Sequence, residues 1–341
     1  MAGGRNGRTA EDMAFKDVAG NVRVKRILKL ALERNRVPNS LIFGGPEGVG
    51  KTALALTLAK TLNCQTLTDD SCDECPSCRA IDEGRHPDVM TFAAEVRDVK
   101  IEQTRLLKQM AYLRPMLGKK RVFIIEEAEN LNEASANSLL KVLEEPPSFT
   151  HVFLVTASPF RLLPTIRSRC RTLTFSAIGR EEIEEILIER EFSREQARIL
   201  SLIVDGNLDR ALELEWDQVQ ALKEEAWGLF ESLASTDRPS RFLERFGTVP
   251  KAVQEEFGAV LEVFSSFARD ILLLRLGGDA SLLLNPDLEG RLRGAAGSWA
   301  APQVVGVIEE IDRVLADLRG NLNKGLLAMT FFSNFTELTH V

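Results

Sequence analysis

Residues 45–52 read Gly-Pro-Glu-Gly-Val-Gly-Lys-Thr and match the phosphate-loop pattern G-x-x-x-x-G-K-[ST]. An apolar run precedes them and an Ala/Leu-rich stretch at 53–62 follows, so we expect a strand, the loop and a helix in that order. The glycines of the loop are Gly45, Gly48 and Gly50. They let backbone N–H groups curve around phosphate oxygens, and the helix N-terminus adds positive potential. Lys51 would contact the β- and γ-phosphates and Thr52 would ligate Mg²⁺. A Gly-rich turn that matches by chance, or a nucleotide site without turnover, remains an alternative.

A phosphate loop that hydrolyses its nucleotide needs a carboxylate at the end of a neighbouring strand. The apolar run 121–125 is followed directly by Glu126 and Glu127. We expect Glu126 on the magnesium side and Glu127 where it can polarise the attacking water. Thr156 ends a later apolar run and could sense the γ-phosphate, although a threonine at a strand end is a common feature. The alternative for the two acids is a run of solvated charges before a helix.

Four cysteines with the spacing C-x7-C-x2-C-x2-C lie between the phosphate-loop helix and the next expected strand. They are Cys64, Cys72, Cys75 and Cys78. Closely spaced thiolates can point at one ion, and four of them complete the tetrahedral shell that structural Zn²⁺ prefers. A shell closed by thiolates has no open position, so we assign it a structural role. The alternatives are reduced thiols on a loop or, with less support because no strand precedes the pairs, a redox site.

The elements that must position these residues follow from the apolar pattern. Short apolar runs alternate with helical stretches from residue 17 to about 176, which favours a parallel α/β sheet. The runs are nearly continuous, as expected for strands covered on both faces. We expect strands at residues 41–43, 88–92, 121–125, 152–156 and 172–175. The phosphate loop follows the first of them, and the acidic pair follows the third.

Beyond residue 178 the apolar spacing is helical. We expect helices at residues 181–191, 194–204, 241–246, 251–276, 300–316 and 324–338. Ser193 is the expected N-cap of the second of these helices. The polar, proline-containing stretch 235–240 predicts a domain boundary.

Composition limits the class of protein. The length of 341 residues predicts two or three domains. A formal charge of −7 argues against binding nucleic acid by overall basic charge, although a local basic stripe stays compatible with it. No apolar run reaches the length of a transmembrane helix, and the polar N-terminus has no apolar signal core. We therefore expect a reducing cytoplasm, where cysteines are more often metal ligands or free thiols than disulfides.

Several motifs together resemble the clamp-loader branch of the AAA+ ATPases. Residues 136–147 read ANSLLKVLEEPP, and Ser168-Arg169-Cys170 follows them. Further elements that look like this family are Asp17-Val18-Ala19-Gly20, His86-Pro87-Asp88 and Asn321-Leu322-Asn323. The resemblance covers nearly the whole chain. The length, without a long tail, is more similar to the delta-prime type of subunit than to the tau/gamma type.

The resemblance implies three parts: an α/β P-loop AAA+ module with a parallel sheet over residues 1–177, a small helical lid over 178–237, and an all-α collar for oligomerisation over 238–341. It places a zinc module at residues 64–78. It also implies a subunit of the DNA polymerase III holoenzyme that binds ATP with Mg²⁺ and helps load the sliding clamp onto primed DNA. The expected partners are tau/gamma and delta subunits in a heteromeric ring, and no membrane.

The resemblance also implies that Arg169 acts in trans as an arginine finger. A guanidinium is planar and always charged, so it can stabilise charge on a neighbour's γ-phosphoryl group. Arg161, Arg167 and Arg171 form a basic cluster around Arg169 that we expect to face a neighbouring subunit. The alternative for Arg169 is an arginine that bridges to an acid within its own domain.

Two positions depart from the family pattern. Glu126 stands where an aspartate is usual, and the longer side chain shifts the expected metal geometry. Asp209 stands where hydrolysing relatives usually carry a sensor arginine, and Arg210 comes one position late, a rotation of about 100° on a helix. We therefore expect weak or absent hydrolysis at this chain's own site. A non-hydrolysing stator that donates Arg169 is one alternative function. A homomeric AAA+ motor such as a branch-migration helicase is another, against which the cysteine insert and the third helical part count.

Overall fold

The computed structural model describes residues 14–15, 17–67, 69–92, 101–204, 206–234, 240–246, 253–319 and 324–339. The chain forms two compact units. The first comprises Met1–Glu182 with Gly206–Asp209, and the second comprises Ile183–Asp205 with Arg210–Val341. Residues 235–239 of the expected boundary and the motif Asn321-Leu322-Asn323 lie outside the described residues.

The first unit is built on a five-stranded parallel sheet with the strand order β2-β3-β4-β1-β5. The strands are β1 (Ser40–Gly44), β2 (Val89–Phe92), β3 (Arg121–Ile125), β4 (Thr150–Thr156) and β5 (Arg171–Thr174). Each lies within a residue or two of its expected bounds, so the predicted parallel α/β sheet is confirmed. β1, β3 and β4 are buried at every position, which explains their continuous apolar sequences.

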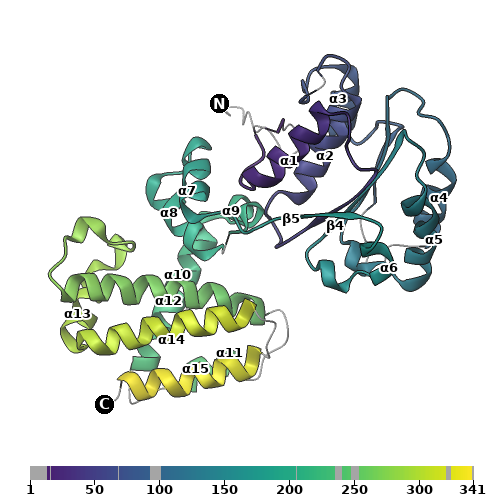
Figure 1. The fold of residues 1–341 in the computed structure, drawn as a ribbon. Coiled ribbons are helices and arrows are strands. Elements are labelled where there is room, and N and C mark those ends of the chain that lie inside the picture. The colour runs from purple at the N-terminus through teal and green to yellow at the C-terminus, as the bar shows by residue number, and fades with distance from the viewer. Residues whose placement is uncertain are drawn as a thin grey trace. The chain divides into compact units, whose positions relative to one another are not determined.

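Helices cover both faces of this sheet (Figure 1). α1 (Val22–Glu33) and α2 (Lys51–Asn63) lie on one face, and α4 (Ile101–Ala111), α5 (Glu133–Glu144) and α6 (Pro164–Arg167) lie on the other. The core of the second face joins Leu107 of α4 and Leu139 of α5 to Phe123 of β3. Shorter elements are α3 (Pro76–Asp82) and the 3-10 helices η1 (Ala128–Asn130) and η2 (Pro159–Arg161).

The second unit contains helices and no strand among its described residues. Its helices are α8 (Arg194–Ile203), α10 (Trp216–Ala234), α11 (Ser240–Phe246), α12 (Val253–Arg275), α13 (Glu289–Ser298), α14 (Ala301–Arg319) and α15 (Lys324–Thr339), with the 3-10 helices η3 (Ala280–Leu282) and η4 (Pro286–Leu288). Two further helices, α7 (Arg180–Glu189) and α9 (Leu208–Glu213), cross the sequence divisions between the units. Ser193 caps α8 in a capping box with Gln196, which confirms the predicted N-cap. Phe230 lies within 6 Å of the ring centroids of Trp227, Phe264 and Phe335, so an aromatic cluster fills the core.

The apolar spacing did not single out α10 or α13, although it did predict α11, α12, α14 and α15. α13 contains several glycines and small residues and has little amphipathic contrast. Within the described part of the chain, no helix combines the length and apolarity that a membrane crossing requires.

Candidate functional site

The phosphate-loop sequence connects the end of β1 to the start of α2, so the expected strand–loop–helix context is confirmed. Gly48 and Gly50 have φ angles of 63° and 80°, in the left-handed region that favours glycine. The Gly45 N–H donates to the Thr156 carbonyl at 3.2 Å, which ties the loop to the end of β4. A Cβ atom at Gly45 would lie 2.4 Å from the carbonyl oxygen of Phe175. The backbone therefore approaches its neighbours so closely that only glycine fits.

Lys51 is buried at the first position of α2, and its Nζ donates to the carbonyl of Pro46 within the loop. Burial lowers the pKa of Lys51, while the charges of Glu47, Glu129 and Asp209 act in the opposite direction. The ammonium group therefore lies inside the loop, within the electrostatic range of several carboxylates.

The two expected magnesium ligands contact each other. The pKa of Glu126 is raised overall. Burial raises it most, a hydrogen bond with Thr52 opposes this effect, and the charge of Glu127 adds to it. Glu127 is exposed, has φ 46°, and accepts a hydrogen bond from Asn130 Nδ2 at 2.9 Å. The fold thus brings Thr52 and Glu126 together and places Glu127 on the solvent side of the same turn.

Thr156, the residue predicted to sense the γ-phosphate, lies at the end of β4. Thr156 is buried, and its Oγ1 accepts the N–H of Ser158 at 3.0 Å. The next residue, Ala157, donates its N–H to Glu129 Oε1 at 3.0 Å. Glu129 Oε2 is buried and has no hydrogen-bond partner among the described residues. Glu129 was not a predicted site residue, although its place in the acidic sequence after β3 was a signal that could have found it.

The segment Gly206–Asp209 lies against the phosphate loop within the first unit. The Leu208 N–H donates to the Gly48 carbonyl at 2.8 Å. A Cβ at Gly48 would lie only 1.6 Å from Asn207 Oδ1, so Asn207 packs directly on this glycine. The charge of Asp209, the last residue of this segment, acts on Lys51 and raises its pKa.

Arg169 is held on its own unit. Its Nε donates to Glu144 Oε1 at 2.6 Å, and its Nη1 donates to the Thr165 carbonyl at 2.9 Å and to Ser168 Oγ at 3.2 Å. The Arg169 side chain is 33% exposed and that of Glu144 is 45% exposed. This ion pair is the contact that the alternative interpretation of Arg169 requires, and the role in trans stays a prediction.

Arg167 of the expected basic cluster lies beside an exposed aromatic ring. Phe160 is 88% exposed, and the guanidinium of Arg167 lies 5.6 Å from its ring centroid. Cys170 is partly buried against the sheet core, and burial raises the pKa of its thiol to about 12. Large exposed aromatic side chains next to cations are typical of protein–protein contact surfaces.

The four expected metal ligands converge. Their Sγ atoms all lie within 4.8 Å of one another, an arrangement that fits a tetrahedral metal ion. Cys64 is the C-cap of α2, and Cys75 is the N-cap of α3. The Cys75 N–H donates to Cys72 Sγ at 3.3 Å, and the Cys78 N–H donates to Cys75 Sγ at 3.5 Å. Burial tends to raise the pKa of Cys64, but donors from Thr66 and Leu67 lower it to about 6, whereas burial and the neighbouring Cys75 raise the pKa of Cys78.

The motif His86-Pro87-Asp88 has a structural role. The buried Asp88 carboxylate accepts the N–H groups of Met116, Leu117 and Gly118 at 2.7–2.9 Å and pairs with Arg121 at 2.7 Å. Burial tends to raise the pKa of Asp88, but these donors outweigh it and lower the pKa. His86 is buried and lies 3.1 Å from Ser77 Oγ through Nε2. The motif therefore anchors the loop before β3.

Comparisons with known proteins agree with these features. The family described as "DNA polymerase III, delta subunit" matches residues 20–179. The chain is 31% identical over 265 residues to DNA polymerase III subunit delta' of Bacillus subtilis (strain 168), across 76% of this chain and 80% of that protein. It is 38% identical over 207 residues to DNA polymerase III subunit tau of Salmonella typhimurium, but this match spans 59% of the chain and 32% of the tau subunit. Among solved structures, a gamma subunit-related protein of Thermotoga maritima aligns with a TM-score of 0.41 and 21% identity, across 92% of this chain and 99% of that chain.

Proposed function

The chain belongs to the family of DNA polymerase III delta-prime subunits, and from that premise we propose that it helps load a sliding clamp onto primed DNA as one subunit of a clamp loader. The observation that carries the proposal is the similarity to a delta-prime subunit over most of both chains. The proposed partners are tau/gamma and delta subunits in a heteromeric ring, which acts on the clamp and on DNA in the cytoplasm. The proposed division of the chain is the nucleotide-binding, lid and collar parts at 1–177, 178–237 and 238–341.

The test is a loading assay with purified components. Clamp loading onto primed circular DNA is measured with the full set of subunits and with this chain left out. We expect loading to fall to background without the chain and to return when it is added back. Full loading in its absence would contradict the proposal.

We also propose that residues 45–52 bind ATP with Mg²⁺. Thr52 and Glu126, which contact each other, would hold the metal, and Lys51 would contact the phosphates. The bound Mg²⁺ would neutralise phosphate charge, while the glycine-rich backbone orients the nucleotide. The test is equilibrium binding of Mg·ATP to the isolated chain beside Lys51→Ala. Equal binding by the two proteins would contradict a site at this loop.

A stator without its own hydrolysis is the second candidate, and Asp209 is the observation that favours it. The carboxylate at a sensor-arginine position lies near Lys51, where it repels rather than stabilises charge that develops on a γ-phosphoryl group. In this case the chain would bind nucleotide, hold the ring together and donate Arg169. Robust ATP turnover by the isolated chain, abolished by Lys51→Ala, would exclude the stator.

The four cysteines are proposed to hold one structural Zn²⁺. The convergence of four sulfurs supports this ion, because a closed all-sulfur tetrahedral shell is the ligand set that zinc takes in structural sites. The zinc would tie the segment after α2 to α3 and supply no catalytic step.

A further inference from the structure

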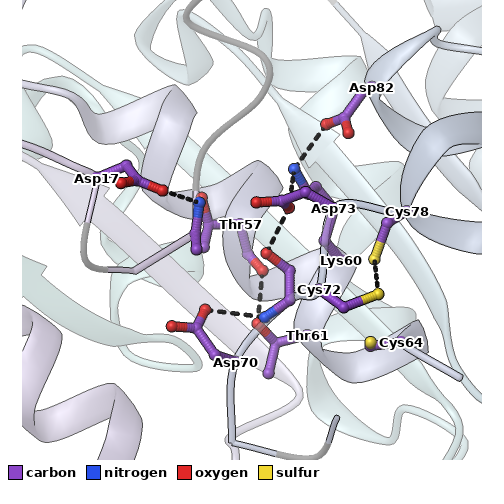
Figure 2. A network of polar contacts seen from close by, with 12 residues as sticks. Asp17, Thr57, Lys60, Thr61, Cys64, Asp70, Cys72, Asp73, Cys78 and Asp82 are labelled. Atoms are coloured by element: carbon purple, nitrogen blue, oxygen red, sulfur yellow. Dashed lines mark hydrogen bonds and ion pairs between the residues drawn. The ribbon is translucent and has the colours of Figure 1, made fainter. Parts of the chain in front are cut away.

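Lys60 is a buried lysine in α2 that neither the phosphate loop nor the cysteine ligands account for. Its side chain is 1% exposed, and its Nζ lies 2.6 Å from Asp73 Oδ1 and 2.8 Å from Asp82 Oδ1. Burial alone would lower the pKa of Lys60, but its hydrogen bonds to the two carboxylates outweigh burial and raise the pKa. A charged ammonium therefore lies inside the fold between two acids (Figure 2).

The first of these acids lies within the cysteine ligand sequence itself. Asp73 follows Cys72 and has φ 57°, an uncommon left-handed conformation for a residue other than glycine. Its Oδ1 also accepts the hydroxyl of Ser71 at 2.7 Å. Lys60 and Ser71 therefore converge on the side chain of the residue that turns the backbone between Cys72 and Cys75.

The second acid belongs to the other half of the cysteine region. Asp82 is the last residue of α3, the helix that Cys75 caps and that contains Cys78. Cys64 lies at the C-terminal end of α2, the helix that carries Lys60. One ammonium group thus joins α2 to both segments that bring the remaining sulfurs to Cys64. Figure 2 shows Lys60 with Asp73 and Asp82, and the sulfurs of Cys64, Cys72 and Cys78 near them.

We propose that Lys60 is a positioning residue for the metal site, which fixes the two cysteine-bearing segments on α2 and offsets the negative charge of the thiolate–metal centre. The inference rests on the proposed zinc site and adds to it. A Zn²⁺ ion held by four thiolates is a net negative centre, and Asp73 and Asp82 add further negative charge nearby. Removing one partner of a buried ion pair leaves an uncompensated charge, so the carboxylates would move toward water and pull the segments with them.

Lys119 provides a useful contrast. Its Nζ donates to the carbonyl of Cys64 at 2.6 Å, so a second cation lies close to the ligands. That contact touches one segment through one backbone oxygen, whereas Lys60 joins two segments through two carboxylates. Lys119→Met is therefore expected to affect metal retention less than Lys60→Met.

The first test measures the rate at which a chelator removes zinc from the full chain. Outer-sphere partners of metal ligands typically change metal affinity 10–100-fold, so we expect Lys60→Met to release zinc about 10-fold faster or more. Lys60→Arg keeps the charge and is expected to release zinc at a rate nearer to that of the wild type. Lys141→Met, at an exposed position of α5, is the matched control and should match the wild type. A folded Lys60→Met protein with the wild-type release rate would overturn the inference.

The second test needs no variant and applies even where Lys60→Met does not fold. If Lys60 favours metal binding, metal binding must favour the pairing of Lys60 by the same factor. Acylation of Lys60 in the wild-type chain, followed by mass spectrometry, should therefore rise about 10-fold when zinc is removed, while acylation of Lys141 stays constant. Equal protection of Lys60 with and without zinc would overturn its role. A wild-type chain that holds no zinc would overturn the zinc site instead.

Discussion

The two ends of α2 serve two sites of opposite construction. At its N-terminus the phosphate loop meets Glu126, Glu129, Thr156 and Asp209, which come from distant parts of the sequence. At its C-terminus the four sulfurs of the cysteine region come together within residues 64–78, and Asp73 and Asp82 pair with Lys60 of the same helix. The first site gathers carboxylates around the phosphate loop, whereas the proposed zinc shell of the second would leave no open position. We therefore expect changes at the first site to be felt in the assembled ring and changes at the second in the isolated chain.

The largest expected effect concerns Arg169 in the ring. A finger supplied in trans is worth about 10³–10⁵ in rate, so Arg169→Ala should lower clamp-stimulated ATP hydrolysis by the partner subunits about 10³-fold or more at the site it serves. The zinc content and ATP binding of the isolated chain should not change. Normal hydrolysis in a ring verified to contain the variant would leave Arg169 with only its contact to Glu144.

Cys75→Ser tests whether a change in the cysteine region affects the isolated chain. Structural zinc sites contribute about 10–16 kcal/mol of apparent binding free energy, so loss of one ligand should abolish stoichiometric zinc. Elemental analysis should give one zinc per wild-type chain and none in the variant. Hydrogen exchange should speed up across residues 64–82, with β1 and β3 still protected. Cys170→Ser is the control and should retain zinc. Retained zinc in Cys75→Ser would show that the four sulfurs are not the site.

Acid is expected to destabilise the sheet through His151, a buried residue of β4. Burial lowers the pKa of His151 on β4 to about 4, from an ordinary value of 6.5, and its Nδ1 lies 3.2 Å from the Pro38 carbonyl. Because the folded-state pKa is depressed, the contribution of the neutral ring to stability is complete above about pH 6.5 and is lost as the pH falls through 4. The loss should amount to about 3 kcal/mol of the free energy of unfolding.

The measurement is denaturant unfolding of the wild type and His151→Gln between pH 7 and pH 4, with zinc content followed in parallel. Glutamine can still donate to the Pro38 carbonyl, but it does not titrate. We expect a shallower loss of stability in the variant over this range. The same pH dependence in both proteins would assign the acid sensitivity to other groups, the thiolates among them.

The sequence predicted those features that depend on near neighbours. The five strands, the capping box at Ser193 and the convergence of Cys64, Cys72, Cys75 and Cys78 all follow from local spacing or from one ligand chemistry. The phosphate-loop context was equally local, because the strand, the glycines and the helix are consecutive.

The features that the sequence did not predict depend on long-range contacts. Glu129 acquires its place only because β3 and β4 are adjacent in the sheet, which brings it to Ala157. Lys60 was not singled out in the sequence, and only the fold places Asp73 and Asp82 beside it. Local periodicity carries no information on which charge will be buried next to which, so such pairs need the tertiary structure.

The smallest expected effect belongs to Glu144, and it decides what the Arg169 ion pair does. Both side chains are partly exposed, so Glu144→Ala should lower the free energy of unfolding by less than about 1 kcal/mol. The pair holds Nε and thereby orients the guanidinium, so partner hydrolysis should fall by less than about 10-fold, far less than with Arg169→Ala. Denaturant unfolding of the isolated chain and ATPase assays of the ring measure the two quantities. If both substitutions cost the same stability and neither changes hydrolysis, the pair is a bridge within the first unit. If Glu144→Ala slows the ring slightly and Arg169→Ala slows it far more, Glu144 orients a finger that acts on the neighbouring subunit.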